Sequence, residues 1–335
     1  QARLLLLDSG AREIVAIPVA TDGMPAPAGT PARYSIGALG LLAPRGMAVD
    51  PASGALYILD AAALRVVRVD PGAEGDLDGA AALGAGRVSR VDLAPAGLVS
   101  LRGLALHPHT GHLATLSSGR WLFEFLPTGE EVAILALPPG ELVDPQGLAF
   151  GLSGDATDPP TATNLYLADT GLVRASTGLE RGRIVELRLA IVHVPGEAPT
   201  VQAGLDLAAD GDLVLVAPGT YRENVTLRDK AVTLASWFHT TRDPRHIRGT
   251  ILDGDRETVI TVEPTAGPST EIVGLTIQNG DDGISADATL SIRHNYFTGN
   301  RDAIDYESGG GECLWNVFDG NRDDAIDLDG PTAAH

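Results

Sequence analysis

The sequence is poor in several residue types, and each shortage excludes a class of protein. Its single cysteine, Cys313, cannot form an internal disulfide and leaves no group of thiols for a cysteine-based metal site. Lys230 is the only lysine, and the formal net charge is -20. A nucleic-acid-binding protein needs clustered positive charge to neutralise phosphates, so this partner class is disfavoured.

Long apolar runs and aromatic residues are also scarce. Residues 4–7 form an apolar run that is too short for a membrane span or a signal peptide, and no other run reaches about 18 residues. Aromatic residues make up 4% of the chain, whereas its 335 residues include Gly 40 and Pro 22. Many short strands joined by turns produce this balance, so the sequence predicts an all-β protein with room for two domains.

Three stretches of the first half repeat one order of strands and turns. They begin at Gly46, Gly103 and Gly147, and each continues through a turn to a second strand, at 56–60, from Leu113 and at 164–169. Residues 4–8 match the second strand of this unit, so the chain starts inside a repeat. Units of three or four short strands are typical of propeller blades. Residues 1–192 resemble NHL-type and SdiA-regulated-type propellers, and the resemblance implies a partial β-propeller-like domain.

A second pattern begins after the Pro- and Gly-containing segment 195–199. Apolar positions 201, 205 and 208 predict a helix over 200–210, and short strands are expected at 213–217, 223–227 and 231–235. The sequence from Pro199 to Leu227 resembles the segment that begins the domain in pectin-lyase-like right-handed parallel β-helix proteins. The resemblance implies that residues 193–335 form such a β-helix, with the helix as an N-terminal cap over its open end.

Residues 272–327 repeat with a period of about 21, which is one coil of a parallel β-helix. Asn295 and Asn316 occupy one turn position, and Asn300 and Asn321 occupy another. We expect the inward positions to stack in columns, namely Ile277, Ile284, Ile292, Phe297, Ile304, Phe318 and Ile326. The pattern ends without a cap and the first repeat begins part-way, so a chain that is longer at both ends is expected.

Carboxylates recur near one corner of successive coils, and they are the candidate metal ligands: Asp281, Asp282, Asp302, Asp305, Asp323, Asp324 and Asp327. Such a cluster is tolerated when it is solvated, when Arg301 and Arg322 pair with it, or when Ca²⁺ bridges it. In polysaccharide lyases of the resembled superfamily, Ca²⁺ on such carboxylates acidifies a uronate proton. The resemblance then implies Asp281, Asp302 and Asp323 as ligands and Arg301 or Arg322 as the catalytic base.

Two further groups of residues have both a functional and an ordinary interpretation. The basic stretch 237–249 contains Arg242, Arg245 and His246, which are candidates for binding an acidic glycan from a loop, or belong to a solvated loop. His107, His109 and His112 have spacing that suits a metal ion, but they also fit a blade turn shaped by Pro108 and Gly111.

The main expectation is a secreted or cell-surface repeat protein that binds carbohydrate or builds an extracellular structure, with Ca²⁺ as a candidate cofactor. One alternative is a polysaccharide lyase or epimerase that acts on an acidic glycan. Another is a propeller-based scaffold for protein partners, because propellers bind mainly through their loops. Motifs for nucleophilic hydrolases, P-loops and dinucleotide binding are absent from the sequence.

Overall fold

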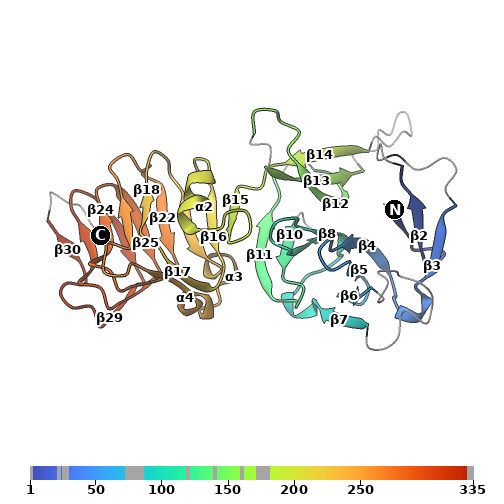
Figure 1. Cartoon of the computed structure of the whole chain (residues 1–335), viewed down its shortest axis with the longest axis horizontal. Coiled ribbons are helices and arrows are strands. Elements are labelled where there is room, and N and C mark those ends of the chain that lie inside the picture. Colours follow the sequence, from blue (N-terminus) through green and yellow to red (C-terminus); the bar gives the residue numbers. More distant parts are fainter. Residues whose placement is uncertain are drawn as a thin grey trace. The chain divides into compact units, whose positions relative to one another are not determined.

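A computed structural model describes residues 3–20, 24, 30–71, 87–117, 121–138, 142–158, 162–170 and 182–329. The chain divides into two compact units, Gln1–Arg188 and Leu189–His335, with the second beginning a few residues before the boundary expected at 193 (Figure 1). Strands dominate both units. Among the described residues, no helix combines the length and apolar character that a membrane crossing requires.

The described residues of the first unit form four antiparallel sheets that follow one another along the chain. The first two sheets consist of β1 (Arg3–Asp8), β2 (Glu13–Pro18) and β3 (Ala32–Ser35), and of β4 (Pro44–Val49), β5 (Leu56–Asp60), β6 (Arg65–Val69) and β7 (Val88–Asp92). The third and fourth consist of β8 (Arg102–Leu106), β9 (Leu113–Ser117), β10 (Trp121–Phe125) and β11 (Glu131–Ala136), and of β12 (Pro145–Leu152), β13 (Thr163–Asp169) and β14 (Arg183–Leu187).

The glycine that begins each repeat lets neighbouring sheets approach backbone to backbone. A Cβ atom on Gly46 of β4 would lie 2.4 Å from the backbone nitrogen of Leu104 in β8. A Cβ atom on Gly103 would lie 2.5 Å from a side-chain carbon of Leu148 in β12, and Gly103 has φ +63°. The first strands of successive sheets therefore pack side by side, which is the arrangement of propeller blades. The predicted propeller-type repeats are confirmed for this unit.

The polar residue that ends the second strand of a blade holds the segment before the first strand. The buried Asp60 accepts hydrogen bonds from the backbone N–H groups of Leu42 and Ala43 and pairs with Arg65 at 3.0 Å. Asp169 does the same in the fourth sheet, where its cationic partner is Arg183. In the third sheet Ser117 exchanges hydrogen bonds with Val99 instead. The repeated carboxylate is thus a structural latch.

The second unit begins with β15 (Ile191–Val194) and the helix α2 (Val201–Leu207). The Thr200 hydroxyl accepts from the Ala203 N–H, and Glu223 accepts from the N–H groups of Val201 and Gln202. These bonds satisfy the free N–H groups of the first turn. The helix is shorter than predicted because Ala208 is already extended and the Ala209 N–H donates to Asp212.

After α2 the chain passes through three parallel sheets in turn. The first sheet pairs β15 with β16 (Leu213–Val216), β19 (Thr233–Ser236), β22 (Thr270–Val273), β25 (Thr289–Arg293) and β28 (Gly310–Leu314). The second contains β17 (Gly219–Arg222), β20 (Thr250–Asp253), β23 (Thr276–Gln278), β26 (Tyr296–Thr298) and β29 (Val317–Asp319). The third contains β18 (Val225–Leu227), β21 (Ile260–Val262), β24 (Asp282–Ala286), β27 (Asp302–Tyr306) and β30 (Asp327–Leu328). The predicted parallel strands of this region are confirmed.

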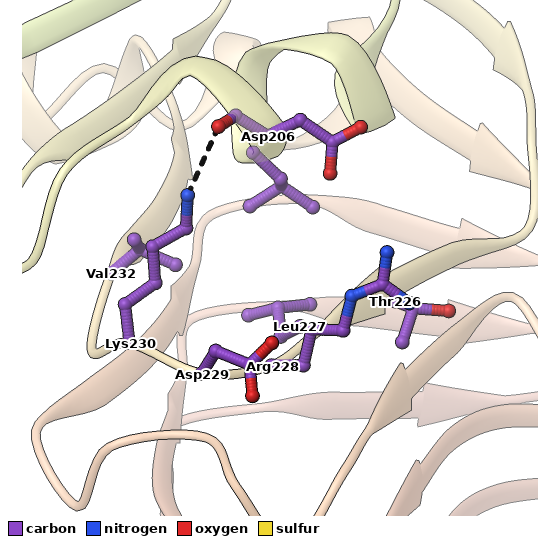
Figure 2. A pocket seen from close by; sticks show the side chains of 8 residues that line it. Asp206, Thr226, Leu227, Arg228, Asp229, Lys230 and Val232 are labelled. Atoms are coloured by element: carbon purple, nitrogen blue, oxygen red, sulfur yellow. Dashed lines mark hydrogen bonds between the residues drawn. The ribbon is translucent and has the colours of Figure 1, made fainter.

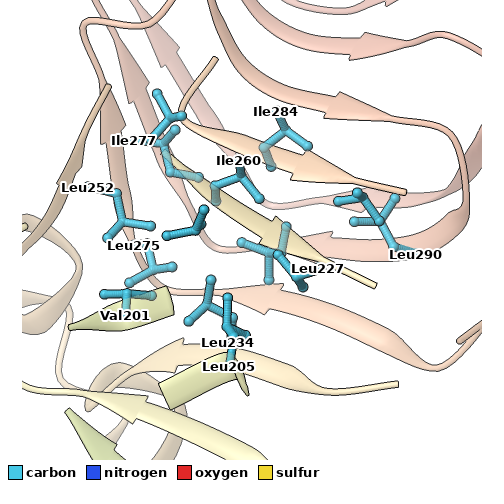
Figure 3. Packing of buried hydrophobic residues seen from close by; sticks show 14 of the residues in the cluster. Val201, Leu205, Leu227, Leu234, Leu252, Ile260, Leu275, Ile277, Ile284 and Leu290 are labelled. Carbon is cyan, nitrogen blue, oxygen red and sulfur yellow. The ribbon is translucent and has the colours of Figure 1, made fainter. Parts of the chain in front are cut away.

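Aliphatic side chains fill the space between the three sheets (Figure 3). Ile260, Ile284 and Ile304 are in register on the third sheet, and Val201 and Leu205 of α2 belong to the same buried cluster. The predicted inward positions are buried except for the last two. Phe318 is half-buried and stacks on Phe297 with ring centroids 5.2 Å apart. The prediction is wrong for Ile326, which is 38% exposed because its segment bends instead of pairing as a strand.

Asparagine side chains connect successive coils at the two turn positions that the sequence indicated. The side-chain amide of Asn295 donates to Asn316 Oδ1 at 3.2 Å, and that of Asn300 donates to Asn321 Oδ1 at 3.1 Å. Asn300 is fully buried, and its Oδ1 accepts from the backbone N–H of Gly280 at 2.8 Å. These bonds satisfy buried turn groups that no strand partner reaches.

Candidate functional site

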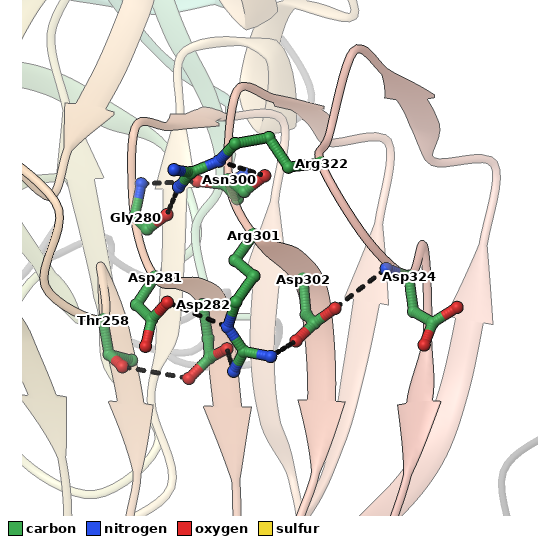
Figure 4. A network of polar contacts seen from close by, with 9 residues as sticks. All are labelled: Thr258, Gly280, Asp281, Asp282, Asn300, Arg301, Asp302, Arg322 and Asp324. Carbon is green, nitrogen blue, oxygen red and sulfur yellow. Dashed lines mark hydrogen bonds and ion pairs between the residues drawn. The ribbon is translucent and has the colours of Figure 1, made fainter.

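The acidic corner of the second unit is organised around one arginine (Figure 4). The guanidinium of Arg301 lies 2.8 Å from Asp281, 3.1 Å from Asp282 and 2.5 Å from Asp302. Asp282 and Asp302 are direct neighbours on β24 and β27, so without a cation their carboxylates would repel each other. The hydrogen bond to Asp281 is the main cause that raises the pKa of Arg301. Arg301 is therefore a charged partner of these carboxylates.

The outer carboxylates of the corner surround Asp302. The backbone N–H of Asp324 donates to Asp302 at 2.8 Å, and carboxylate oxygens of Asp302, Asp323 and Asp324 lie within 4.8 Å of one another. Asp282 accepts from the Thr258 hydroxyl at 3.2 Å, and burial is the main cause that raises its pKa. Arg301 already compensates the buried members, so this corner does not need a metal ion to be stable.

Arg322, the other candidate base, faces away from the carboxylates. Its guanidinium donates to the carbonyl oxygens of Gly280, at 3.0 Å, and Asn300, at 3.4 Å (Figure 4). Within the described residues it forms no ion pair. Arg301 and Arg322 follow equivalent asparagines in the sequence, but among the described residues Arg301 pairs with three carboxylates whereas Arg322 donates to backbone carbonyls.

A second acidic cluster lies further along the third sheet. Carboxylate oxygens of Asp305, Asp327 and Asp329 lie within 4.8 Å of one another, and Asp305 is directly opposite Asp327 on β27 and β30. Asp305 is 6% exposed, and its buried Oδ1 has no hydrogen-bond partner in the described part of the chain. Burial, followed by Glu307 and the neighbouring aspartates, raises the pKa of Asp305 to about 6. Three oxygen donors with one unsatisfied atom fit a hard cation such as Ca²⁺.

The basic stretch is not the solvated loop that one interpretation predicted. It forms two short helices, α3 (Phe238–Thr241) and α4 (Arg245–Gly249), and Trp237 packs edge-on against the buried His246 with ring centroids 5.5 Å apart. Arg242 lies over the Phe238 ring, whereas the exposed Arg245 pairs with Asp243 at 2.6 Å. The three candidate residues therefore contact different partners. Apolar Trp237 and Phe238 fold the segment onto the stack.

Aromatic rings form a column beside this segment. Phe238 and His294 have ring centroids 5.0 Å apart, and His294 stacks on Trp315 at 4.9 Å with an interplanar angle of 17°. His294 and Trp315 hold one turn position in successive coils, with φ 57° and 56°, and Gly274 holds it one coil earlier. A Cβ atom at Gly274 would meet Phe238 at 2.8 Å, so this glycine makes room for the ring. The indole of Trp315 is 67% exposed.

Sequence reasoning missed this aromatic column. Trp315 and His294 each follow a strand of the first parallel sheet. Neither residue belongs to a motif, or to an alternation of apolar and polar residues, that would mark a site. The available signal was the repeat itself, because aligning the coils places a histidine and a tryptophan where the earlier coil has glycine. Burial is the main cause that lowers the pKa of His294, and Arg242 and Arg293 lower it further. A neutral imidazole suits stacking beneath the indole.

Lys230 lines a small cavity of 210 Å³ at the end of α2 (Figure 2). Its ammonium donates to the carbonyl oxygens of Asp206, at 3.2 Å, and Ala208, at 2.5 Å. These are the carbonyls that the end of a helix leaves without partners, and a cation there also suits the helix dipole. The only lysine of the chain is therefore engaged in holding the helix on the stack.

The histidines of the third blade point to different partners. His107 Nδ1 accepts from the N–H groups of His109 and Thr110 in the turn, whereas the ring of the buried His112 lies 2.7 Å from Glu124. His109 contacts Thr163 at 3.1 Å. This arrangement matches the blade-turn interpretation of the three residues.

A larger cleft of 470 Å³ opens beside the second parallel sheet. It is lined by Arg222, Asp253, Asp255, Arg256, Asn279, Gly299 and Arg322. Gly299 keeps the cleft open, because a Cβ atom there would lie 3.1 Å from Asn279 Oδ1. The cleft brings together arginines from three coils that are far apart in the sequence.

No protein-family model and no curated protein matches this chain. Solved structures similar to it include a nidogen/laminin complex (18% identity, TM-score 0.32, 55% of this chain and 61% of that chain). They also include the calcium-binding protein regucalcin from Agrobacterium tumefaciens (18%, 0.31, 54% and 55%) and a luciferin-regenerating enzyme (14%, 0.34, 55% and 55%). The chain thus spans somewhat more than half the length of each. At these identities and TM-scores the likenesses assign neither family nor function.

Proposed function

We propose that this protein is a glycan-binding scaffold whose second unit is a right-handed parallel β-helix capped by α2. The observation that carries the proposal is the aromatic column that ends in the exposed indole of Trp315. A pyranose ring presents a face of C–H groups, and a flat indole can cover that face. Polysaccharides that a protein of this kind would contact lie outside cells, so the proposal includes export to the cell surface.

Rigidity is the second argument for a binding surface at Trp315. A non-glycine residue with positive φ costs free energy, and such strain tends to persist where the conformation has a use. Stacking on His294 fixes the indole, so little side-chain entropy would be lost when a sugar binds. A preorganised aromatic surface of this kind favours binding and supplies no acid or base for catalysis.

The lyase alternative is less well supported by the geometry. A catalytic arginine must give up its proton and reach the substrate. Arg301 is held by three carboxylates that favour its charged form, and Arg322 is directed to backbone carbonyls. We therefore propose that both arginines organise the turns between the second and third sheets.

Ca²⁺ is proposed as a structural ion at Asp305, Asp327 and Asp329. These carboxylates have no arginine partner among the described residues, and the buried Asp305 Oδ1 lacks a hydrogen bond. Burial is the main cause that raises the pKa of Asp305 to about 6, and a bound cation would favour its ionised form and offset the repulsion from Asp327 and Asp329. The ion would join the last two coils, and the chemistry of glycan binding would not depend on it.

The proposal is tested by isothermal titration of a panel of oligosaccharides, neutral and acidic, into the full chain. At least one should bind the wild-type protein, and Trp315→Ala should weaken that binding about tenfold or more through the lost stacking area. Trp121→Ala is the matched control, because Trp121 is also exposed but lies in the first unit. Equal affinity in the Trp315 variant and the wild type would refute the proposed surface.

A protein-interaction scaffold built on the propeller-type unit is the second candidate. It is favoured by the buried latches at Asp60 and Asp169, which hold the segments between blades in fixed positions. Rigid frames that present loops are common binding platforms. Capture of a protein partner by residues 1–188 alone, with no glycan bound by the full chain, would support this candidate over the first.

A further inference from the structure

An exposed aliphatic residue recurs at the same position in three successive blades of the first unit. Leu42, Val99 and Val143 each stand four residues before the glycine that begins a blade, and each follows a buried leucine. They are 67%, 57% and 40% exposed, respectively. Single exposed aliphatic residues are ordinary on protein surfaces, whereas three at one position of neighbouring repeats can form a patch.

The fold uses the backbone of these three residues and not their side chains. The N–H group of Leu42 donates to Asp60 at 3.1 Å, and the N–H groups of the two valines donate to the equivalent polar residues at 3.3 Å and 3.1 Å. Every residue type except proline offers this N–H group. Because the leucine before each of them already supplies the buried contact, the latch gives no reason for an aliphatic side chain here.

The three residues lie at the same end of neighbouring strands. A Cβ atom on Gly46 would lie 2.6 Å from the carbonyl carbon of Gly103, and one on Gly103 would lie 3.1 Å from the Cα atom of Gly147. The segments before these glycines also meet, because Arg102 pairs with Asp144 across the junction of the third and fourth blades. The exposed aliphatic residues therefore follow one another on one face of the unit, and we call them the apolar arc.

Arg45 is an unpaired cation beside the apolar arc. It holds the position that Arg102 holds in the next blade, where Arg102 pairs with Asp144. The residue that corresponds to this aspartate for Arg45 is Ser100, which carries no charge. The exposed Arg45 forms no ion pair with any described residue. The repeat thus keeps the cation at this junction without its anion.

A second arginine adds positive charge at the same place. Arg90 is exposed and donates to the carbonyl oxygen of Leu39, three residues before Leu42, at 3.4 Å. It forms no ion pair within the described part of the chain, and Asp92, two residues later, accepts from the backbone N–H of Ala94. In a chain with a net charge of -20, positive charge beside an apolar surface is a local reversal of sign.

We propose that the apolar arc and its two arginines bind a segment of another protein that carries aliphatic side chains and carboxylates. The aliphatic side chains would remove the arc from water, and a carboxylate would stand beside Arg45 as Asp144 stands beside Arg102. Complementary charge at the rim would select the partner. The inference rests on the second candidate function, whose partner chemistry it names, and it is independent of the glycan surface.

Selection from a random peptide library displayed on phage, with the full chain as bait, tests the inference. Peptides enriched on the wild type should contain several aliphatic residues and carry net negative charge. The triple variant Leu42→Ser/Val99→Ser/Val143→Ser keeps the latch N–H groups and should bind a synthetic copy of the most enriched peptide about tenfold more weakly or worse. Leu152→Ser/Ile184→Ser is the matched control, because both residues are exposed in the same unit outside the arc, and it should bind as the wild type does.

Arg45→Gln separates the contribution of charge from that of apolar contact. Glutamine is the natural residue at this position of the fourth blade, as Gln146, so the substitution suits the fold. The variant should bind the same peptide about threefold more weakly at low salt. The affinity of the wild type should fall as salt is added, and that fall should be smaller in the variant.

Several outcomes would overturn the inference. Enriched peptides with net positive charge would contradict the charge assignment, and a wild-type dimer that the triple variant abolishes would show that a second copy covers the arc. If the enriched peptides bind the triple variant as tightly as the wild type, the arc is wrong although the chain still binds protein segments. If no peptide is enriched, the protein-interaction candidate fails with it. Circular dichroism confirms that each variant is folded.

Discussion

The two units of this protein use the same element, the short strand, with different ways of fixing its place. In the propeller-type unit the strands are antiparallel, and a latch such as Asp60 ties each blade to the segment before it. In the second unit the strands are parallel and in register, and columns such as Ile260, Ile284 and Ile304 continue from coil to coil. The first unit adds discrete polar contacts to separate apolar clusters, whereas one apolar cluster continues from coil to coil in the second.

This difference has consequences for where function can evolve. Each coil of the second unit contacts mainly its neighbours, so a turn can change without changing the core. The same turn position holds Gly274, His294 and Trp315 in successive coils, while the inward positions of these coils stay apolar. In the blades, by contrast, the equivalent position keeps a polar residue that binds the preceding segment, namely Asp60, Ser117 and Asp169. Variation at equivalent turns therefore marks the second unit as the place to look for a site.

The largest expected effect comes from disrupting the buried aliphatic column of Ile260, Ile284 and Ile304. Ile304→Asp places an unpaired charge between two packed layers and should lower the free energy of unfolding of the second unit by about 4–5 kcal/mol or more. Ile304→Val, the matched control, should cost about 1 kcal/mol. Denaturant titration with limited proteolysis measures this and reports on each unit. An Ile304→Asp protein with an unchanged midpoint would contradict the packed column.

Breaking a latch should have a smaller effect that stays in the first unit. Asp60→Ala leaves two backbone N–H groups and Arg65 without their buried acceptor and should cost about 3 kcal/mol. Ser117→Ala at the equivalent position of the third blade removes a neutral, more exposed bond and should cost about 1 kcal/mol. Thermal unfolding of the two variants side by side checks the order, and a reversed order would show that the latch is not electrostatic.

The pH dependence of the second unit should reveal Asp305. Burial raises its pKa in the folded protein to about 6, above the ordinary value of 3.8, so the folded state holds a proton that the unfolded state releases. The contribution of Asp305 to the free energy of unfolding should therefore be greatest below pH 3.8. It should fall as pH rises from 3.8 to about 6. Asp305→Asn should remove this slope. Urea titrations at several pH values provide the test, and a slope that survives the substitution would assign it to another group.

Calcium should offset the loss of folding stability that occurs when Asp305 ionises. Millimolar Ca²⁺ at pH 7 should raise the Tm of the second unit by a few degrees, because only the folded state gathers the three carboxylates. Mg²⁺ should do less, since it demands a stricter octahedral geometry. Asp327→Asn should abolish the response, whereas Asp323→Asn, beside the Arg301-bound corner, should keep it. If calorimetry shows that Asp323→Asn loses the rise in Tm with Ca²⁺ while Asp327→Asn keeps it, the ion binds at the Arg301 corner instead.

Much of this fold was visible in the sequence because repeats are local signals. The period of the coils, the helix before them and the repeated units of the first half each have a regular spacing with a simple geometric meaning. Val201 and Leu205 predicted the buried face of α2, and Asn300 and Asn321 predicted equivalent turns. Ile326 was placed wrongly because the repeat pattern continued in the sequence where the strand pairing did not.

The site was less predictable, because its properties depend on contacts between coils. Arg301 and Arg322 follow the same Asn in the sequence, yet one binds three carboxylates and the other binds carbonyls. The burial of Asp305 and its approach to the exposed Asp329 depend on how residues 327–329 lie on β27. The charges of the segment 237–249 favour a loop, although Trp237 and Phe238 decide its packing. These residues differ in the direction of their side chains, and the spacing of residues in the sequence does not determine that direction.

Saturation-transfer difference NMR of a bound oligosaccharide tests the central claim most directly, which is that the parallel unit binds glycan at Trp315. The account predicts that transfer is strongest at the C–H groups of one sugar face and that Trp315→Ala removes it while Trp121→Ala does not. Transfer that is spread evenly over the sugar, or that persists unchanged in Trp315→Ala, would contradict the account.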